Sequence, residues 1–364
     1  MAPTELTARQ RLVRTLQCQS VDRPPLPYWM GFAPWPQTLE RWREESGIGD
    51  LDPATYFGLD PYFEVAPIEY GPWPHVEHKI LREDADWVVS IDFRGITMRN
   101  RRDGLSMPEW ISHPIADRAA WEAYKEQHLQ LRLDERLAKL DAFAAEATQR
   151  DAAVQVGVFP WGVFGTLRDM LGAEECLISF YTQPDLVRDI IETYVELWLA
   201  LYEAVAEKVA IDHLHIWEDM SGKQGSLISM KMVREFMMPA YERLAGFCRA
   251  HDVPIMSVDS DGIVNELVPV MMEHGVNAFM PFEVQAGNDI LETRKQYPTL
   301  GIFGGLDKRA LALGGRAMNR ELERAEEMFS LGGWVAGFDH LIPPDVPWKH
   351  FAEFMQELIR IAGL

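Results

Sequence analysis

Residues 211–219 read Ile-Asp-His-Leu-His-Ile-Trp-Glu-Asp, a short apolar run that ends in two carboxylates. The run has the length of a strand and is bounded by acidic residues, so it predicts a buried β-strand. His213 and His215 stand two positions apart in it, so both side chains point to one face. That depth in the fold favours packing and hydrogen bonding for the two histidines over metal binding.

Short apolar runs of this kind recur along the chain. From about residue 150 they alternate with amphipathic stretches, which is typical of βα units around a parallel sheet. We expect strands at 25–30, 62–66, 154–159, 211–217, 254–258, 277–282, 300–303 and 334–338. We expect helices at 185–208, 229–250, 262–274, 287–297, 316–330 and 347–361. About eight such strands close a (β/α)8 barrel, so the sequence predicts an α/β fold with a single TIM barrel.

Residues 70–115 break this alternation. The segments 88–92 and 95–98 predict an antiparallel hairpin, and helices are expected over 117–149. We therefore expect one barrel domain over residues 1–364, with a β-hairpin and helical insertion at about 70–150 that decorates the barrel, in the manner of a lid.

Composition narrows the classes of function. The chain has a formal net charge of −21, which argues against nucleic acid or an anionic membrane surface as a partner. Its three cysteines form no C-x-x-C pair, which favours a reducing compartment. We see no secretion signal at the N-terminus and no apolar run of the roughly 20 residues that a membrane helix requires. We therefore expect a cytoplasmic protein.

Acidic residues follow most of the expected strands, at the barrel end where active sites form. The residues at these strand ends are Glu218, Asp219, Asp259, Asp261, Glu283, Asp307, Lys308, Asp339 and His340. Carboxylates gathered at one end raise each other's pKa unless a cation neutralises them, which favours a metal ion. The alternative is that Asp219, Asp261 and Asp307 are helix N-caps. For His340, a structural hydrogen bond is the alternative to a functional role.

Aromatic and basic residues are candidates for substrate binding. The aromatic candidates are Trp29, Phe32 and Trp35 in the first βα loop, with Phe159 and Trp161 further along the chain. They predict an apolar wall for a planar ring, or equally a packed core. Arg168 and Lys223 could hold a carboxylate or a phosphate, and a surface ion pair is the alternative for each.

A set of motifs in this order resembles the uroporphyrinogen decarboxylase superfamily, and the resemblance covers nearly the whole chain. The motifs are Thr7-Ala8-Arg9-Gln10-Arg11-Leu12, Asp22-Arg23-Pro24-Pro25-Leu26-Pro27, Trp217-Glu218-Asp219-Met220, Val258-Asp259-Ser260-Asp261-Gly262, Gly304-Gly305-Leu306-Asp307-Lys308 and Asp339-His340. The superfamily contains the haem-pathway decarboxylase and methyltransferases that serve corrinoid proteins. The resemblance implies the barrel but not one reaction.

Two departures from the superfamily motifs limit which of its reactions this chain could catalyse. The decarboxylase carries Arg-Gln-Ala-Gly-Arg-Tyr after its first strand, where this chain has Trp29-Met30-Gly31-Phe32-Ala33-Pro34. Without these arginines, a highly carboxylated tetrapyrrole has lost its main recognition groups. The thiol-methylating members bind zinc through His-X-Cys, Glu and Cys. Here Asp259-X-Asp261, Glu283 and Asp339-His340 stand in their places, a harder set of oxygen and imidazole ligands.

The resemblance therefore implies a methyltransferase of the corrinoid-dependent demethylase type. It would move a methyl group from a small O- or N-methylated compound, such as a methoxyaromatic, to cobalamin or a corrinoid protein. We expect His340, Glu218 and Asp219 to be catalytic and Lys308 to contact substrate. Asp259, Asp261, Glu283 and His340 are expected to hold zinc or another divalent metal, and a homodimer is implied by the resemblance alone.

Two other classes stay open at this point. A lyase would decarboxylate a small acid held by Arg168, Lys223 or Lys308, and would release carbon dioxide without any corrinoid. A non-catalytic barrel would have kept the fold and a binding role after losing the chemistry.

Overall fold

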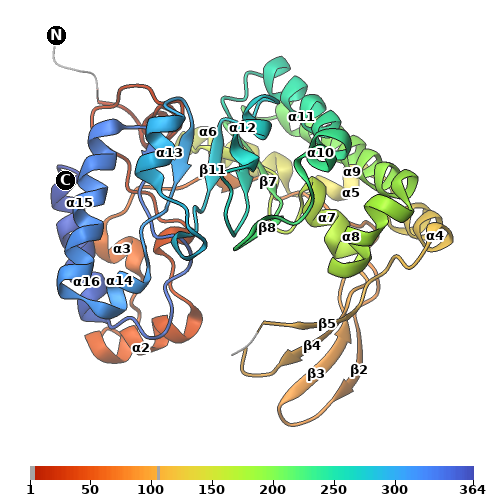
Figure 1. Ribbon diagram of the computed structural model, residues 1–364, viewed down its shortest axis with the longest axis horizontal. Helices are drawn as coiled ribbons and strands as arrows, with labels where there is room; N and C mark the ends of the chain where they lie inside the picture. The colour runs from red at the N-terminus through yellow and green to blue at the C-terminus, as the bar shows by residue number, and fades with distance from the viewer. Residues whose placement is uncertain (1–4, 105–106) are drawn as a thin grey trace.

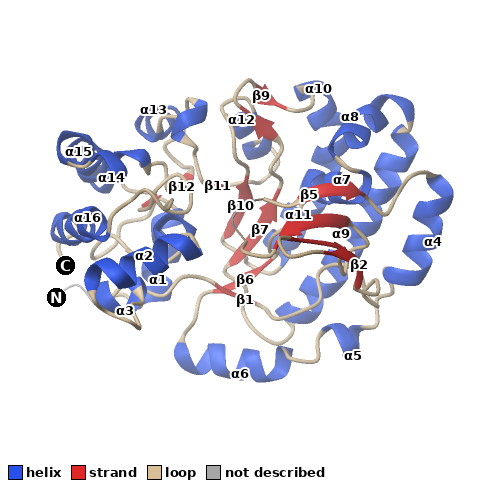
Figure 2. Ribbon diagram, turned by 90° about the horizontal axis from the view of Figure 1, so that it is seen from below, coloured by secondary structure: helices blue, strands red, loops and turns tan. Residues whose placement is uncertain are grey.

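A parallel sheet forms the centre of the molecule in the computed structural model, which describes residues 5–104 and 107–364 (Figures 1 and 2). Its strand order is β1-β6-β7-β10-β11-β12-β13. The strands are β1 (Glu64–Val65), β6 (Val154–Val156), β7 (His213–Trp217), β10 (Ile255–Asp259), β11 (Ala278–Met280), β12 (Gly301–Phe303) and β13 (Trp334–Val335). Each strand pairs with the next one along the chain, with helices between them, so the predicted α/β TIM barrel is confirmed.

The expected first strand, 25–30, is not a regular strand but still joins the two edges of the sheet. On one side Tyr28 N donates to Asp60 O at 3.1 Å, just before β1. On the other side Phe338 N donates to Gly31 O at 2.9 Å, just after β13. Prolines are frequent in this segment, and each lacks the N–H that a ladder needs, which explains why only bridges form.

Helices surround the sheet. After β6 come α7 (Val163–Leu171), α8 (Ala173–Thr182) and α9 (Pro184–Ala206), and after β7 come α10 (Met230–Met232), a π-helical turn (Val233–Met237) and α11 (Met238–Ala250). The later ones are α12 (Leu267–Met272), α13 (Ile290–Gln296), α14 (Arg309–Leu313), α15 (Gly315–Leu331) and α16 (Trp348–Ile361). The N-terminal part contributes α1 (Ala8–Leu16), α2 (Pro36–Ser46) and α3 (Pro53–Phe57). Helices were expected at all of the later positions except α7, α8 and α14.

The insertion is larger than the hairpin expected from the sequence. The expected hairpin is present as β3 (Trp87–Ile91) and β4 (Thr97–Arg101), paired antiparallel. Two further strands, β2 (Lys79–Glu83) and β5 (Glu109–Ser112), extend it to four. Their side chains are exposed, so they lack the buried face that marks a strand in sequence. Figure 1 shows this sheet projecting from the rest of the molecule, followed by α4 (Arg118–His128), α5 (Leu133–Arg136) and α6 (Leu140–Arg150).

No helix in the described part of the chain combines the length and the apolar character that crossing a membrane requires.

Candidate active site at the mouth of the barrel

The carboxyl ends of the parallel strands meet at one end of the barrel, which we call the mouth. Trp217, the last residue of β7, pairs in register with Asp259, the last residue of β10. The chain then turns so that the backbone N–H groups of Glu218 and Asp219 donate to Asp259 O, at 2.8 and 3.1 Å. Residues that are separated by about 40 positions in sequence are thus fixed next to each other.

Glu218 is fully buried and is held by helix α7. Its carboxylate accepts the backbone N–H groups of Val163 and Gly165, both at 3.1 Å, and that of Phe164. The hydroxyl of Tyr241 on α11 donates to Glu218 Oε1, which also accepts from Val163, at 2.5 Å. Burial raises the pKa of Glu218 to about 7, and the Tyr241 and backbone hydrogen bonds oppose that rise. These contacts fit a positioning role better than the catalytic role expected for Glu218 from the sequence.

The first turn of α7 approaches β7 closely because of its glycines. A Cβ on Gly162 would lie 1.9 Å from Trp217 O, and one on Gly165 would lie 2.4 Å from the same oxygen. Any side chain at either position would push the helix away from the strand. The free amides at the helix N-terminus can therefore reach the Glu218 carboxylate, which they stabilise.

Asp219 is neutralised by Arg168, which comes from α7. Arg168 Nη2 lies 2.7 Å from Asp219 Oδ2, and Arg168 Nη1 donates to Asp219 O at 2.7 Å. Asp219 has a φ of +41°, a left-handed conformation that is strained for a residue with a side chain. The double contact with Arg168 holds this turn. Arg168 thus acts as an ion-pair partner, which was the alternative to substrate binding. The pair is only partly exposed, so it is not a fully solvated surface pair.

Asp259 and Asp261 lie at the acidic centre of the mouth. Burial raises the pKa of Asp259 well above its usual value, and the charges of Asp261 and Asp219 raise it further. Burial likewise raises the pKa of Asp261 to about 7, reinforced by Asp219 and Glu283. The charges of Asp261 and Asp219 act on Asp259, and those of Asp219 and Glu283 act on Asp261, so these carboxyl groups lie within electrostatic reach of one another.

Glu283 and His340 complete this cluster. Glu283 Oε2 accepts the backbone N–H of Gly262 at 3.1 Å, and His340 Nε2 lies 4.0 Å from Asp261 Oδ2. Burial lowers the pKa of His340, and Lys308 lowers it further, while Asp339 and Glu283 act in the opposite direction. His340 is therefore mainly a neutral imidazole near pH 7.

The same residues were expected to hold a divalent metal, and their chemistry is that of a hard-cation site. Within residues 5–104 and 107–364, however, no three His, Cys, Asp or Glu side chains are arranged so that they could hold a metal ion. The arrangement does not fit a bound metal as it stands, and the metal site stays a prediction.

Lys308 is engaged by a buried carboxylate. Its Nζ lies 3.1 Å from Asp339 Oδ1, and Asp339 is fully buried. Asp339 also accepts the backbone N–H of Val284 at 2.9 Å. Lys308 was expected to contact substrate, but here its charge is balanced inside the protein. The third basic candidate, Lys223, is exposed, between the short strands β8 (Ser221–Gly222) and β9 (Gly225–Ser226).

Two histidines and a serine form a polar chain inside the barrel, beneath the acidic cluster. His213 Nε2 lies 2.6 Å from Ser257 Oγ, and His215 Nδ1 lies 3.3 Å from the same oxygen. Burial lowers the pKa of His213 well below its usual value and that of His215 to about 4. The hydrogen-bonding role expected for these histidines is present. Ser257 had no motif that could have identified it as their partner.

The aromatic candidates divide into core and surface. Trp29 is buried and its Nε1 donates to Ala336 O at 2.8 Å, Phe32 packs on Phe338, and Trp161 stacks on Tyr194. These three follow the core alternative. Trp35 is half-buried.

Phe159 is 63% exposed and contacts Trp217 edge-on, with ring centroids 4.7 Å apart. The aromatic surface beside the acidic cluster therefore consists of Phe159 and Trp217. Trp217 was not among the binding candidates. Its two-residue spacing from His215 could have identified it as inward-facing.

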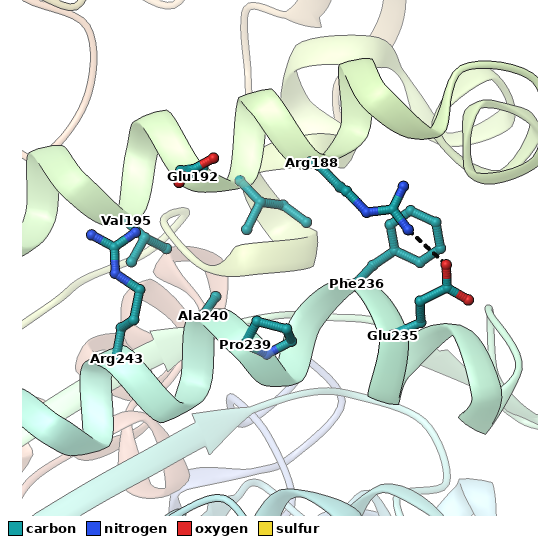
Figure 3. Close-up of a pocket in the computed structure, with 9 residues that line it drawn as sticks. Arg188, Glu192, Val195, Glu235, Phe236, Pro239, Ala240 and Arg243 are labelled. Atoms are coloured by element: carbon teal, nitrogen blue, oxygen red, sulfur yellow. Dashed lines mark hydrogen bonds and ion pairs between the residues drawn. The ribbon is translucent and has the colours of Figure 1, made fainter.

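A separate hollow of about 200 Å³ lies on the outer helices, between α9 and the helical segment that leads into α11 (Figure 3). It is lined by Ile191, Val195, Phe236 and Pro239, with Arg188 paired to Glu235 at 2.6 Å along its edge. None of these residues follows a barrel strand, so we place the chemistry at the mouth.

The chain is similar to known proteins in sequence and in fold. Residues 85–360 match the family described as Uroporphyrinogen decarboxylase (URO-D). Among solved structures, a methyltransferase from Methanosarcina mazei superposes with a TM-score of 0.61 at 17% identity, covering 99% of both chains. An endo-β-1,4-xylanase from Gloeophyllum trabeum gives a TM-score of 0.36 at 12% identity, over 60% of this chain and 79% of its own. Among curated protein sequences, none matches the chain significantly.

Proposed function

The chain belongs to the uroporphyrinogen decarboxylase family, and from this premise we propose that it is a methyltransferase of the methyl-transferring branch. It would move a methyl group from a small O- or N-methylated substrate to cobalamin or to a corrinoid protein. The structural likeness to the Methanosarcina mazei methyltransferase extends over the whole fold and supports this choice of branch.

The observation that carries the proposal is the charge balance of the mouth. Arg168 and Lys308, two of the three cations available for a substrate carboxylate, are each bound to a carboxylate of the protein. The carboxyl groups of Asp259, Asp261 and Glu283 lie in the same mouth and are not the partners of these two cations. Because these two cations are already paired, they are not available to hold a substrate polyanion, and the mouth can accept a neutral or cationic methyl donor, which disfavours the decarboxylase alternative.

The transfer breaks the bond between the methyl carbon and its oxygen or nitrogen, and the electron pair stays on that heteroatom. The acceptor, the Co(I) form of cobalamin, supplies the electron pair for its bond to the methyl carbon. An ether oxygen leaves more readily when it also gains a proton. Asp261 and His340, 4.0 Å apart, are placed to hold that proton at the mouth. Glu218 and Arg168 position the surrounding turn.

The test is direct. Purified protein is incubated with cob(I)alamin and a panel of methoxyaromatic and N-methylated donors, and methylcobalamin is followed by its absorbance. We expect at least one donor to give methylcobalamin, and we expect Asp261→Asn to lose most of that activity while remaining folded. No methylcobalamin with any donor, free or with a corrinoid protein present, would reject the proposal.

Metal analysis of the purified protein completes this test, because a divalent metal could polarise the leaving group in place of a proton. One equivalent of metal that is lost in Asp261→Asn would assign the acidic cluster as its site.

A further inference from the structure

The indole of Trp29 lies at the strand ends, where the barrel opens into the mouth. Its Nε1 donates to Ala336 O at 2.8 Å, just after β13, and its ring meets the Phe303 ring edge-on with centroids 5.6 Å apart. Phe303 is the last residue of β12 and pairs in register with Val335, the last residue of β13. The carboxyl ends of parallel strands share one level, so the indole, in a residue that is only 4% exposed, closes the barrel at that level.

Two glycines make room for this indole. A Cβ on Gly31 would lie 2.6 Å from the Trp29 ring, and a Cβ on Gly337 would lie at the same distance from it. At Gly337, all three of the nearest atoms that such a Cβ would meet belong to the indole. Neither glycine has a left-handed φ, so the backbone there is open to other residues. The glycines therefore fit the flat ring and are not required by a turn.

The indole is also connected to the acidic groups of the mouth through Tyr62. The two rings stack with centroids 6.1 Å apart. Burial raises the pKa of Tyr62, and the charge of Asp259 raises it further, so the phenol lies within electrostatic reach of that carboxyl group. A Cβ on Gly304, directly after β12, would lie 3.1 Å from the indole. Trp29 and Tyr62 thus fill the barrel beside the carboxyl groups, and we call these two rings the floor of the mouth.

We propose that Trp29 is a specificity-determining residue, which sets the depth of the mouth and excludes methyl donors that extend below the strand ends. This inference rests on the proposed function and specifies the size of its substrate. Removal of the indole would free on the order of 100 Å³, enough for about one aromatic ring. The hydrogen bond to Ala336 O and the contact with Phe303 hold the indole in place, so a donor does not displace it.

The experiment compares a one-ring and a two-ring methyl ether, 4-methoxyphenol and 6-methoxy-2-naphthol. Binding of each to the full chain is measured by calorimetry without cobalamin, for the wild type and for Trp29→Ala. We expect the ratio of the two affinities to shift toward the two-ring ether by about tenfold or more in the variant, because the second ring fills the space of the indole. An unchanged ratio, or no binding of either ether to either protein, would overturn the inference.

Two further variants keep the test valid if Trp29→Ala does not fold, since it leaves a void in a packed core. Trp29→Phe keeps a ring and leaves a smaller void, and we expect it to shift the affinity ratio in the same direction by a smaller factor. Gly337→Ala should lower the midpoint of thermal unfolding in the wild type but much less in Trp29→Phe, where the smaller ring leaves room for the added methyl group. An equal loss in both backgrounds would show that Gly337 does not serve the indole and would reject the proposed floor.

Trp121→Phe is the matched control. Trp121 is fully buried on α4, in the insertion and away from the strand ends. We expect this variant to lose stability, as any large-to-small change in the core does, and to bind the two ethers in the wild-type ratio. A shift equal to that of Trp29→Phe would show that the ratio reports general loosening of the protein, and the inference would fail.

Methyl transfer separates the two proposals. If one-ring donors yield methylcobalamin while the Trp29 variants accept two-ring donors no better than the wild type does, the inference fails and the proposed function stands. If the affinity ratio shifts as expected but no donor methylates cob(I)alamin, Trp29 still sets the depth of the mouth and the proposed function fails.

Discussion

The carboxyl groups on the two sides of the barrel mouth have different partners. On the β7 side, the carboxylates of Glu218 and Asp219 have strong donors in the backbone of α7, Tyr241 and Arg168. On the β10–β11 side, Asp259 and Asp261 face mainly other acids and neutral histidines. The first side has the contacts of a scaffold, and on the second side the carboxyl groups lie near like charges.

This difference shows why an acidic residue at a strand end has no fixed role. A carboxylate surrounded by donors stabilises the fold and is costly to remove. A carboxylate surrounded by like charges destabilises the free protein and gains from a bound cation. The experiments below test this contrast.

The largest effect is expected for Glu218→Ala. It would leave three backbone N–H groups and the Tyr241 hydroxyl without their buried acceptor, which should lower the free energy of unfolding by about 3 kcal/mol or more. Glu218→Gln keeps one acceptor oxygen and should lose less. Urea denaturation measures both, with Glu235→Ala as an exposed control that should change stability by less than about 1 kcal/mol. If Glu218→Ala unfolds like the wild type, the scaffold role of this side is wrong.

A smaller loss is expected for Arg168→Met. The substitution removes the two contacts that hold the left-handed turn at Asp219, and we expect a loss of about 1–2 kcal/mol in the free energy of unfolding. Arg188→Met is the matched control, because Arg188 also combines an ion pair with an aromatic ring, Phe236, but lies on the exposed outer hollow. Equal losses in the two variants would show that the Arg168 ion pair stabilises the fold no more than an exposed ion pair does.

The pH dependence should separate the two kinds of buried group. The carboxyl groups of Asp259, Asp261 and Glu218 have raised pKa values, so the folded chain keeps protons that the unfolded chain releases. Their stabilisation is complete near pH 4 and is lost as the pH rises through about 7 and beyond.

His213 and His215 have lowered pKa values and act in the opposite direction below about pH 6.5. The urea midpoint should therefore fall as the pH rises from about 7.5 to 8.5, where the folded carboxyl groups still lose protons and the histidines of the unfolded chain are largely neutral. A midpoint that rises over this interval would contradict the raised pKa values.

The smallest effect is expected for Asp261→Asn on stability. Near pH 8 the substitution removes a repelling charge, so stability should stay equal or rise by less than about 1 kcal/mol. Asp307→Asn is the comparison within the mouth, because Asp307 is bound by Arg309 at 2.7 Å and should lose stability instead. A clear loss in Asp261→Asn would show that this carboxylate also has a structural partner.

Local signals were sufficient for the barrel and for the gathering of acidic residues at one end of it. Short apolar runs that alternate with amphipathic helices predicted seven of the strands, and the acidic ends of those runs pointed to the mouth. The segment 25–30 was wrong as a regular strand because its prolines limit ladder pairing. The edge strands β2 and β5 were missed because an exposed strand has no apolar period.

The sequence alone could not predict the role of each acidic residue. Glu218 and Asp261 are both acidic residues just after a barrel strand, and nothing in their neighbours distinguishes them. Glu218 meets amides more than 50 positions away and a tyrosine on another helix, which required α7 and α11 to pack against β7. Trp29 and Phe32 look like a binding wall in sequence, and packing places them in the core.

The sequence by itself determined the alternation of strands and helices and the gathering of acids at one end, because both depend on periodicity and on the common direction of parallel strands. Only the tertiary structure decided which acids received donors and which were left facing one another. Which carboxyl groups have donors depends on helices that pack together from distant parts of the chain. The same packing determines which carboxyl groups at the mouth have no cation beside them.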